Sequence, residues 1–221
     1  MPLPITDEKK VRLTRQVFSL YAQYGFDGIS MDEVARRTKI SKATLYKYFK
    51  SKEEIVRAMV GEITAHMSSL PFTADHGIEG VLESVSTIYS KGILVAAYSS
   101  SKFLTDLQNK FPGLYAGFIL ALDALQSRFT AFYECAVEKG YCKKLCFHLV
   151  GEQFKNMLPT IMNPDYLRKH GMTLAEAVRE YYKLLLYQIL NEAYLAVTDQ
   201  ESTYSFLEGL VEILDNVLLV P

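Results

Sequence analysis

The side chains most able to do chemistry lie in residues 28–52, which read GISMDEVARRTKISKATLYKYFKSK. A helix over residues 41–49 that buries Leu45 and Phe49 points Ala43 and Lys47 away from the core, because each residue turns by about 100°. Its exposed face then carries small, hydroxyl, aromatic and basic side chains. No carboxylate occurs between Ser41 and Lys52. This combination suits a helix that enters a DNA major groove and contacts base edges and phosphates.

Two short helices joined by a tight turn must position this face. Ser30 with Glu33 forms a capping-box pattern, and Ser41 is suited to cap the helix that follows. The turn between the two helices is Thr38-Lys39-Ile40, which is helix-turn-helix spacing. A small helical core with a solvated basic face is the alternative interpretation. The agreement of caps, charge and spacing disfavours it.

Helical periodicity and cap residues continue along the chain, and no alternating strand of useful length occurs. The expected helices cover 6–24, 31–38, 41–49, 51–67, 75–98, 102–109, 112–139, 145–161, 173–197 and 204–219. We therefore predict an all-α fold, with an N-terminal three-helix domain followed by a C-terminal helical bundle. The break at 71–77 divides the chain into a DNA-binding domain, 1–68, and a ligand-binding and dimerisation domain, 75–221.

The composition fits a globular protein whose two ends carry opposite charge. Hydrophobic residues make up 49% and charged residues 22% of the 221 residues. The net charge of −1 hides +5 in residues 1–60 and −6 in residues 61–221. A basic end on an acidic body indicates that only the N-terminal end meets a polyanion. The overall charge disfavours a non-specific DNA-compacting protein.

The chain shows no sign of a membrane partner. Its longest stretches without Asp, Glu, Lys or Arg are twelve residues, whereas a membrane-spanning helix needs about 18 or more. The N-terminus becomes charged at once, which is unlike a signal peptide. The odd number of cysteines, three, favours a reducing compartment, so we expect a cytoplasmic protein.

Residues suited to metal binding or catalysis are sparse. Cys142, Cys146 and His148 are closely spaced, which is compatible with a metal or redox site and also with buried, inert thiols. No fourth ligand is evident nearby, so inert thiols are favoured. No spacing resembles a catalytic nucleophile, and no glycine-rich phosphate loop occurs. We expect no catalytic residue, no metal and no cofactor.

The segment ISKATLYKYFKSKEEI resembles the signature of the TetR/AcrR family of bacterial transcriptional repressors. Tyr24-Gly25-Phe26 and Gly28-Ile29-Ser30, which precede it, fit the same signature. The strong resemblance covers roughly residues 8–60, and a weaker one continues beyond. It implies an all-α homodimer whose C-terminal domain holds the inducer pocket and the dimer interface.

The resemblance also implies which residues contact DNA. By position, these are Lys42, Ala43 and Thr44 for bases, Tyr46 and Tyr48 for phosphates or bases, Lys47 and Lys52 for phosphates, Ser30 as a cap that also bonds phosphate, and Ser41 as the cap of the recognition helix. Two positions depart from the family pattern. Thr38-Lys39 stands where many members have Ala-Gly, and Asp32 stands where some members have a base-reading cation.

Residues 98–162 are rich in aromatic and methionine side chains. Ordinary helix packing explains any one of them, but as a group they are able to line an apolar pocket. The predicted ligand-binding residues are Phe103, Phe118, Leu122, Phe129, Tyr133, Phe154 and Met157. Asp123 and Arg128 are the only charged residues between Gly113 and Tyr133, which favours a mostly apolar ligand.

The sequence therefore predicts a ligand-responsive transcriptional repressor that binds a palindromic operator on double-stranded DNA as a homodimer. A small, mostly apolar inducer would release it by moving the helix 52–67. The expected dimer face combines 173–197 with 145–161. The alternative is an all-α enzyme or binding protein for a hydrophobic small molecule, in which the basic N-terminal domain is incidental.

Overall fold

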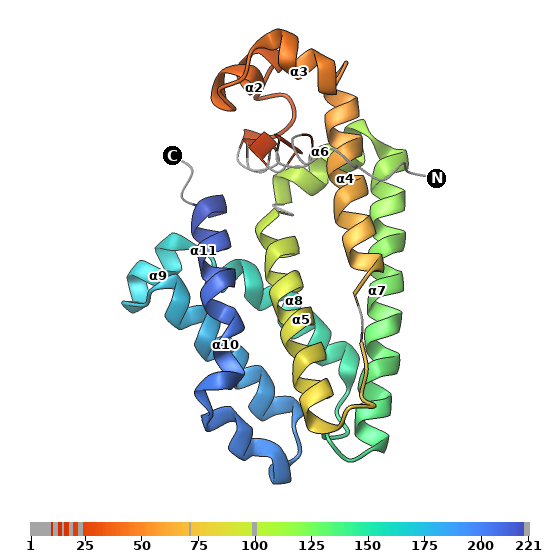
Figure 1. Ribbon diagram of the computed structural model, residues 1–221, viewed down its shortest axis with the longest axis vertical. Helices are drawn as coiled ribbons and strands as arrows, with labels where there is room; N and C mark the ends of the chain where they lie inside the picture. Colours follow the sequence, from red (N-terminus) through yellow and green to blue (C-terminus); the bar gives the residue numbers. More distant parts are fainter. Residues whose placement is uncertain are drawn as a thin grey trace. The chain divides into compact units, whose positions relative to one another are not determined.

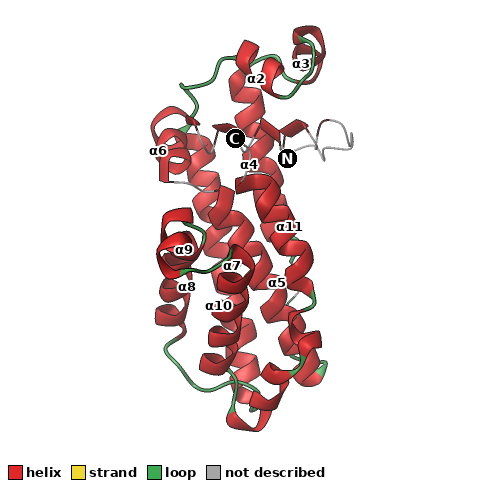
Figure 2. Cartoon of the chain, turned by 90° about the vertical axis from the view of Figure 1, so that its left-hand side faces the viewer, coloured by secondary structure: helices red, strands yellow, loops and turns green. Residues whose placement is uncertain are grey.

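The computed structural model is helical in all the elements that it describes, which confirms the all-α prediction (Figures 1 and 2). It describes residues 24–70, 72–98 and 101–218, together with 10, 13, 14, 16, 17, 20 and 21. The predicted helix 6–24 lies largely outside the described residues. The residues that are described there, from 10 to 24, are helical.

The described elements follow one another with short connections. They are α2 (Met31–Arg37), α3 (Lys42–Tyr48), α4 (Lys52–Ser68), α5 (Gly77–Tyr98), α6 (Ser101–Lys110), α7 (Pro112–Glu138), α8 (Phe147–Ile161), α9 (Pro164–His170), α10 (Leu174–Ile189), the 3₁₀ helices η1 (Glu192–Asp199) and η2 (Glu201–Tyr204), and α11 (Phe206–Leu218). Most bounds lie within a few residues of those expected from periodicity.

Side-chain caps begin the helices of the helix-turn-helix and the helix after it, as predicted. The Ser30 hydroxyl accepts a hydrogen bond from the backbone amide of Glu33 at 3.2 Å and starts α2. Ser41 caps α3 in the same way, and Ser51 caps α4. Each cap satisfies a backbone donor that would otherwise lack a partner at the first turn.

The turn between α2 and α3 contains the only non-glycine residue with a positive φ among the described residues. Lys39 has φ 55°. Its amide donates to the carbonyl of Arg36, and the amide of Ile40 donates to the carbonyl of Ala35. This pair of bonds is the Schellman arrangement that ends many helices, in which glycine usually occupies the left-handed position. The departure at Lys39 therefore places a side chain in a strained backbone conformation.

The chain divides into two compact units. The first combines Met1–Ser69 with Tyr98–Ala124, and the second combines Leu70–Ala97 with Leu125–Pro221. Residues 98–124 thus group with the helix-turn-helix, although the sequence division assigned them to the C-terminal domain. Compact units are defined by contacts and not by function, so the division into 1–68 and 75–221 stays a prediction.

In the first unit, Phe26 joins the segment before α2 to α6 and its C-terminal end. Its ring lies edge-on to those of Phe103 and Phe111, with centroids 5.3 and 5.7 Å away. Its backbone amide donates to Asp106 Oδ2 at 2.8 Å. Asp27 forms an ion pair with Lys110. The helix-turn-helix therefore rests on α6 as well as on α4.

In the second unit, α10 packs against α8 and α11 around an aromatic core. Tyr89 of α5 is fully buried, and its hydroxyl donates to the backbone carbonyl of Val178 on α10 at 2.5 Å. The Tyr182 ring lies 4.8 Å from that of Tyr89 and edge-on to Phe206 of α11. These rings hold α5, α10 and α11 together.

One prediction about this unit was wrong, and one helix was not predicted. The helix expected over 173–197 ends at Ile189, because Leu190 is extended and forms an isolated antiparallel bridge with Cys142. The amide of Lys143 donates to the Ile189 carbonyl at 2.8 Å. The short helix α9, capped by the Asn163 side chain, was not predicted. Residues 48 positions apart decide where α10 ends, and local periodicity does not contain that information.

Candidate nucleic-acid interface

Helix α3 has one buried face and one exposed face, as its sequence predicts. Leu45 is fully buried, and Phe49, which follows the helix, is buried beside it. Lys42, Ala43, Thr44 and Lys47 are exposed, and Tyr46 retains 47% of its accessible surface. An aromatic side chain this exposed on a polar helix is available to contact a partner.

The N-terminal turn of α3 is held by its own hydroxyl groups. The Ser41 side chain accepts a hydrogen bond from the Thr44 amide at 3.1 Å. The hydroxyls of Ser41 and Thr44 are also bonded to each other at 2.8 Å. Thr44 therefore presents its hydroxyl in a fixed position at the end of the helix where base contacts were predicted.

The lysines of the motif differ in whether their ammonium groups have a partner within the protein. Lys47 is exposed and makes no ion pair with any residue that the structure describes. Lys42 Nζ lies 2.7 Å from Asp32 Oδ2 of α2. Lys52 Nζ donates to the backbone carbonyl of Phe26, so this predicted phosphate contact also holds the fold together.

Three other predicted contacts, Ser30, Tyr46 and Tyr48, differ in how exposed they are. Ser30 is exposed, and its hydroxyl is engaged as the α2 cap. Tyr48 is half-buried, whereas Tyr46 is exposed. The nine predicted DNA-contacting residues thus lie at α3, at its cap and at the starts of α2 and α4.

Glu33 holds two arginines on α2. Its carboxylate accepts hydrogen bonds from Arg36 and Arg37, with Arg37 Nε at 2.6 Å. These bonds, that to Arg36 first, lower the pKa of Glu33 to about 2. The Arg37 guanidinium also lies over the Tyr24 ring, 4.4 Å from its centroid. Both arginines are therefore committed to contacts within the protein.

The predicted ligand-binding residues do not form one group. Phe103, Phe118 and Leu122 belong to the first compact unit, and the other four belong to the second. Phe103 is fully buried against Phe26 and so is part of the packing of the helix-turn-helix. Its large apolar side chain serves the core, which sequence reasoning had given as the ordinary explanation.

Three of the four residues in the second unit enter two ring clusters. Phe129 and Tyr133 both contact the ring of Phe147, at centroid distances of 4.7 and 4.6 Å. Phe154 instead stacks on Tyr181 and covers Gly92, where an added Cβ would lie 2.5 Å from the ring. Met157 is half-buried at the edge of this core.

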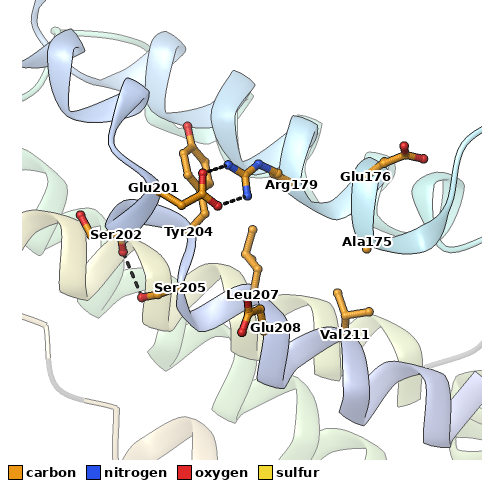
Figure 3. A pocket seen from close by; sticks show the side chains of 10 residues that line it. All are labelled: Ala175, Glu176, Arg179, Glu201, Ser202, Tyr204, Ser205, Leu207, Glu208 and Val211. Carbon is orange, nitrogen blue, oxygen red and sulfur yellow. Dashed lines mark hydrogen bonds and ion pairs between the residues drawn. The ribbon is translucent and has the colours of Figure 1, made fainter.

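A groove of about 510 Å³ lies elsewhere in the second unit, between α10, η2 and α11 (Figure 3). Glu201 receives two hydrogen bonds from Arg179, at 2.8 and 2.6 Å, and the guanidinium lies over the Tyr204 ring. The residues that line the groove are Ala175, Glu176, Arg179, Glu201, Ser202, Tyr204, Ser205, Leu207, Glu208 and Val211. None of these residues was predicted to line a groove. The sequence predicted one helix as far as 197, and such a helix would not bring residues 201–211 back beside Arg179.

The cysteines are unlike one another. Cys142 is buried, and burial raises the pKa of its thiol to about 12. Cys146 is exposed, so the expectation of buried thiols is wrong for it. The described part of the chain contains no cluster of three or more metal-ligating side chains. Among the described helices, none combines the length and the apolarity needed to cross a membrane.

The helix-turn-helix matches a known family. Residues 16–59 fit the model of the bacterial regulatory proteins of the tetR family. The biofilm operon icaADBC HTH-type negative transcriptional regulator IcaR of Staphylococcus epidermidis is 23% identical over 194 residues. This match covers 82% of this chain and 97% of IcaR. Nearly the whole length of that regulator is therefore represented here.

Solved structures share the helical fold. The ketosteroid transcriptional regulator KstR2 of Mycobacterium tuberculosis aligns with a TM-score of 0.60 and 14% identity, over 85% of this chain and 97% of KstR2. AibR, in complex with isovaleryl coenzyme A and operator DNA, aligns with a TM-score of 0.53 and 16% identity, over 81% of this chain and 98% of AibR. These relatives are regulators of transcription and not enzymes. Residues 16–59 thus carry the tetR-family regulatory region, and the similarity to a regulator of transcription extends over most of the chain.

Proposed function

We propose that the protein represses transcription by binding an operator through α3 and that a small molecule releases it. The observation that carries this proposal is the division of α3 between a buried face, formed by Leu45, and an exposed face that bears Thr44, Tyr46 and Lys47. Base contacts from Thr44 would give sequence preference, and phosphate contacts from Lys47 would give affinity for any sequence. IcaR, a negative regulator, supports repression as the outcome.

Selection from random duplex DNA tests the operator proposal. The full chain should enrich two inverted half-sites, spaced by about one helical repeat, roughly 34–36 Å, or a multiple of it. The salt slope is the slope of the logarithm of the binding constant against the logarithm of the salt concentration. Lys47→Ala should weaken binding to every sequence, and on the selected site it should flatten the salt slope by about 0.9. Thr44→Ala should relax sequence preference and leave that slope unchanged. Recovery of a single asymmetric half-site would contradict the proposal.

A homodimer is the proposed binding species, with α8 and α10 at its interface. Leu149 of α8 and Leu184 of α10 are 69% and 52% exposed, and Tyr187 of α10 is exposed as well. Gln153 and Gln188 connect the two helices by a side-chain hydrogen bond at 2.9 Å. An apolar face that spans two packed helices suits a second copy of the same face. Leu184→Glu should yield a monomer in analytical ultracentrifugation.

We propose that residues 75–221 bind the inducer and that residues 1–68 bind DNA. AibR binds both isovaleryl coenzyme A and operator DNA in one complex. Of the predicted ligand residues, Leu122, Phe129, Phe154 and Met157 are only partly buried. We propose that a mostly apolar ligand binds in this part of the chain. A ligand that weakens operator binding must itself be bound more weakly by the operator complex, by the same factor. Phe129→Ala should lower ligand affinity, and thermal unfolding separates that loss from simple destabilisation.

A further inference from the structure

One ion pair crosses the turn between the two helices of the DNA-binding motif. Lys42, the first residue of α3, lies with its Nζ 2.7 Å from Oδ2 of Asp32 in the first turn of α2. The residues are ten positions apart, and helical periodicity does not dictate this contact. Both side chains remain exposed, at 63% for Lys42 and 59% for Asp32.

The stability of the fold does not account for this pair. Ion pairs as exposed as this one contribute little to stability, because water and salt screen both charges. The dipole of α2 favours an acid in its first turn. It does not explain why the first cation of the next helix lies against that acid. We therefore consider how the pair affects the binding of Lys42 to DNA.

The pair changes the charge that the motif offers to DNA. Glu33 engages Arg36 and Arg37, and Asp32 engages Lys42. Within residues 28–52, the exposed cations that make no ion pair with described residues are Lys39, Lys47 and Lys50. Each cation that neutralises a phosphate releases counterions and steepens the salt dependence of binding by about 0.9. A cation held by a carboxylate does not supply that gain until the pair is broken.

We propose that Asp32 is an affinity-setting residue that withholds Lys42 from DNA phosphates. Through this pair it lowers binding to DNA of any sequence and leaves a larger share of the binding free energy to base contacts from α3. The inference rests on the proposed DNA-binding function. It assigns Asp32 a role opposite to that of the surrounding cations: a carboxylate on the binding face that weakens non-specific association.

A four-protein comparison tests this role. The wild type, Asp32→Asn, Lys42→Gln and the double variant are titrated, as full chains, against a fluorescent duplex of random sequence at several salt concentrations. The base contact predicted for Lys42 gives no preference on random-sequence DNA, and Asp32 holds its charge, so Lys42→Gln should give the salt slope of the wild type on this duplex. Asp32→Asn should steepen the slope by about 0.9, which is about fivefold tighter binding at 0.15 M salt. The double variant should return to the wild-type slope.

A matched control removes the effect of net charge. Asp165 of α9 pairs with Arg168, is exposed and lies outside the motif. Asp165→Asn makes the same change in charge and should leave the slope unchanged. The role of Asp32 is refuted if its variant tightens binding equally with and without Lys42, because simple repulsion of phosphate would then suffice. It is also refuted if Lys42→Gln alone flattens the wild-type slope, because Lys42 would already contact phosphate.

The measurements distinguish a failure of the Asp32 role from a failure of the proposed DNA-binding function. A wild type with no salt-dependent DNA binding would overturn the proposed function itself. A wild type that binds DNA normally, with no coupling between residues 32 and 42 in the four-protein comparison, would overturn only the role of Asp32. Circular dichroism of the variants establishes that each has folded before the titration is interpreted.

Discussion

The carboxylate of Asp106 on α6 accepts a hydrogen bond from the backbone amide of Phe26, with 2.8 Å between the nitrogen and Oδ2. The two residues are 80 positions apart, and both belong to the first compact unit. The bond satisfies an amide just before the helix-turn-helix that no helix satisfies. The sequence led us to expect that only the helix 52–67 connects the DNA-binding motif to the rest of the chain. That expectation is incomplete, because α6 contacts the motif directly.

Removal of the Asp106 carboxylate should loosen the segment before α2. Asp106→Ala leaves the partly buried Phe26 amide without its acceptor, which costs about 1–3 kcal/mol of unfolding free energy. Hydrogen exchange at the Phe26 amide should accelerate, and the melting temperature should fall. Asp106→Asn keeps a carbonyl acceptor and should retain most of the protection. Equal exchange rates in the wild type and the alanine variant would show that the amide has another acceptor.

The turn at Lys39 offers a test of stored backbone strain. Its φ of 55° disfavours any residue with a Cβ, by roughly 1 kcal/mol relative to glycine. Lys39→Gly should therefore be more stable than Lys39→Ala by about 1 kcal/mol, less the greater freedom of glycine in the unfolded chain. Urea denaturation followed by circular dichroism measures both variants. The comparison between them removes the effect of losing the lysine charge. Without strain, Lys39→Ala would instead be the more stable variant, by about 0.4–1 kcal/mol.

The local features of this protein were predictable, and the long-range ones were not. Ser30, Ser41 and Ser51 act as caps where the sequence indicates caps, because a cap needs only a side-chain oxygen within three residues of the amide it accepts from. The burial of Leu45 follows from helical periodicity in the same way. The sequence therefore predicted the helix-turn-helix and the composition of its exposed face.

Contacts between distant segments account for what the sequence did not reveal. Asp32 was recognised as unusual, but its partner Lys42 depends on the angle between two helices. The end of α10 depends on Cys142, and the packing of Phe103 depends on Phe26. Aromatic content alone does not distinguish a residue that lines a pocket from one that fills a core. For that reason the predicted ligand group divided among separate clusters.

Two buried tyrosines should respond differently to loss of their hydroxyls. The Tyr182 hydroxyl is buried and has no hydrogen-bond partner among the described residues, and burial raises its pKa. The Tyr89 hydroxyl donates to the Val178 carbonyl. Tyr182→Phe should be neutral or raise the unfolding free energy by about 1–2 kcal/mol, whereas Tyr89→Phe should lower it by about 1 kcal/mol.

Urea denaturation of the two variants, followed by far-ultraviolet circular dichroism, makes this comparison. The rings are close together in one core, so the variants share their surroundings and differ in hydrogen bonding. A loss of stability in Tyr182→Phe that matches or exceeds that in Tyr89→Phe would mean that the Tyr182 hydroxyl has a partner in solution.

Cys142 should make the fold sensitive to alkali. Burial raises the pKa of its thiol from 9.0 to about 12 in the folded protein. Below pH 9 the thiol is protonated in both the folded and unfolded states, so it adds no pH dependence. Between pH 9 and 12 the unfolded chain releases this proton and the folded protein keeps it. The free energy of unfolding therefore falls with rising pH, by up to about 1.4 kcal/mol per pH unit for one group.

Denaturation at pH 8 and pH 10 under reducing conditions measures this loss, and Cys142→Ala should make it smaller. Cys142→Ala should also lower stability at pH 8, because it removes a buried side chain; only the difference between the two pH values is diagnostic. The exposed Cys146 provides the matched control, and Cys146→Ala should lose stability with pH as the wild type does. Tyr21, whose pKa burial raises to about 12, contributes a similar loss above pH 10 in all three proteins and cancels in the comparison. An unchanged pH dependence in Cys142→Ala would mean that this thiol ionises as readily in the folded protein as in the unfolded chain.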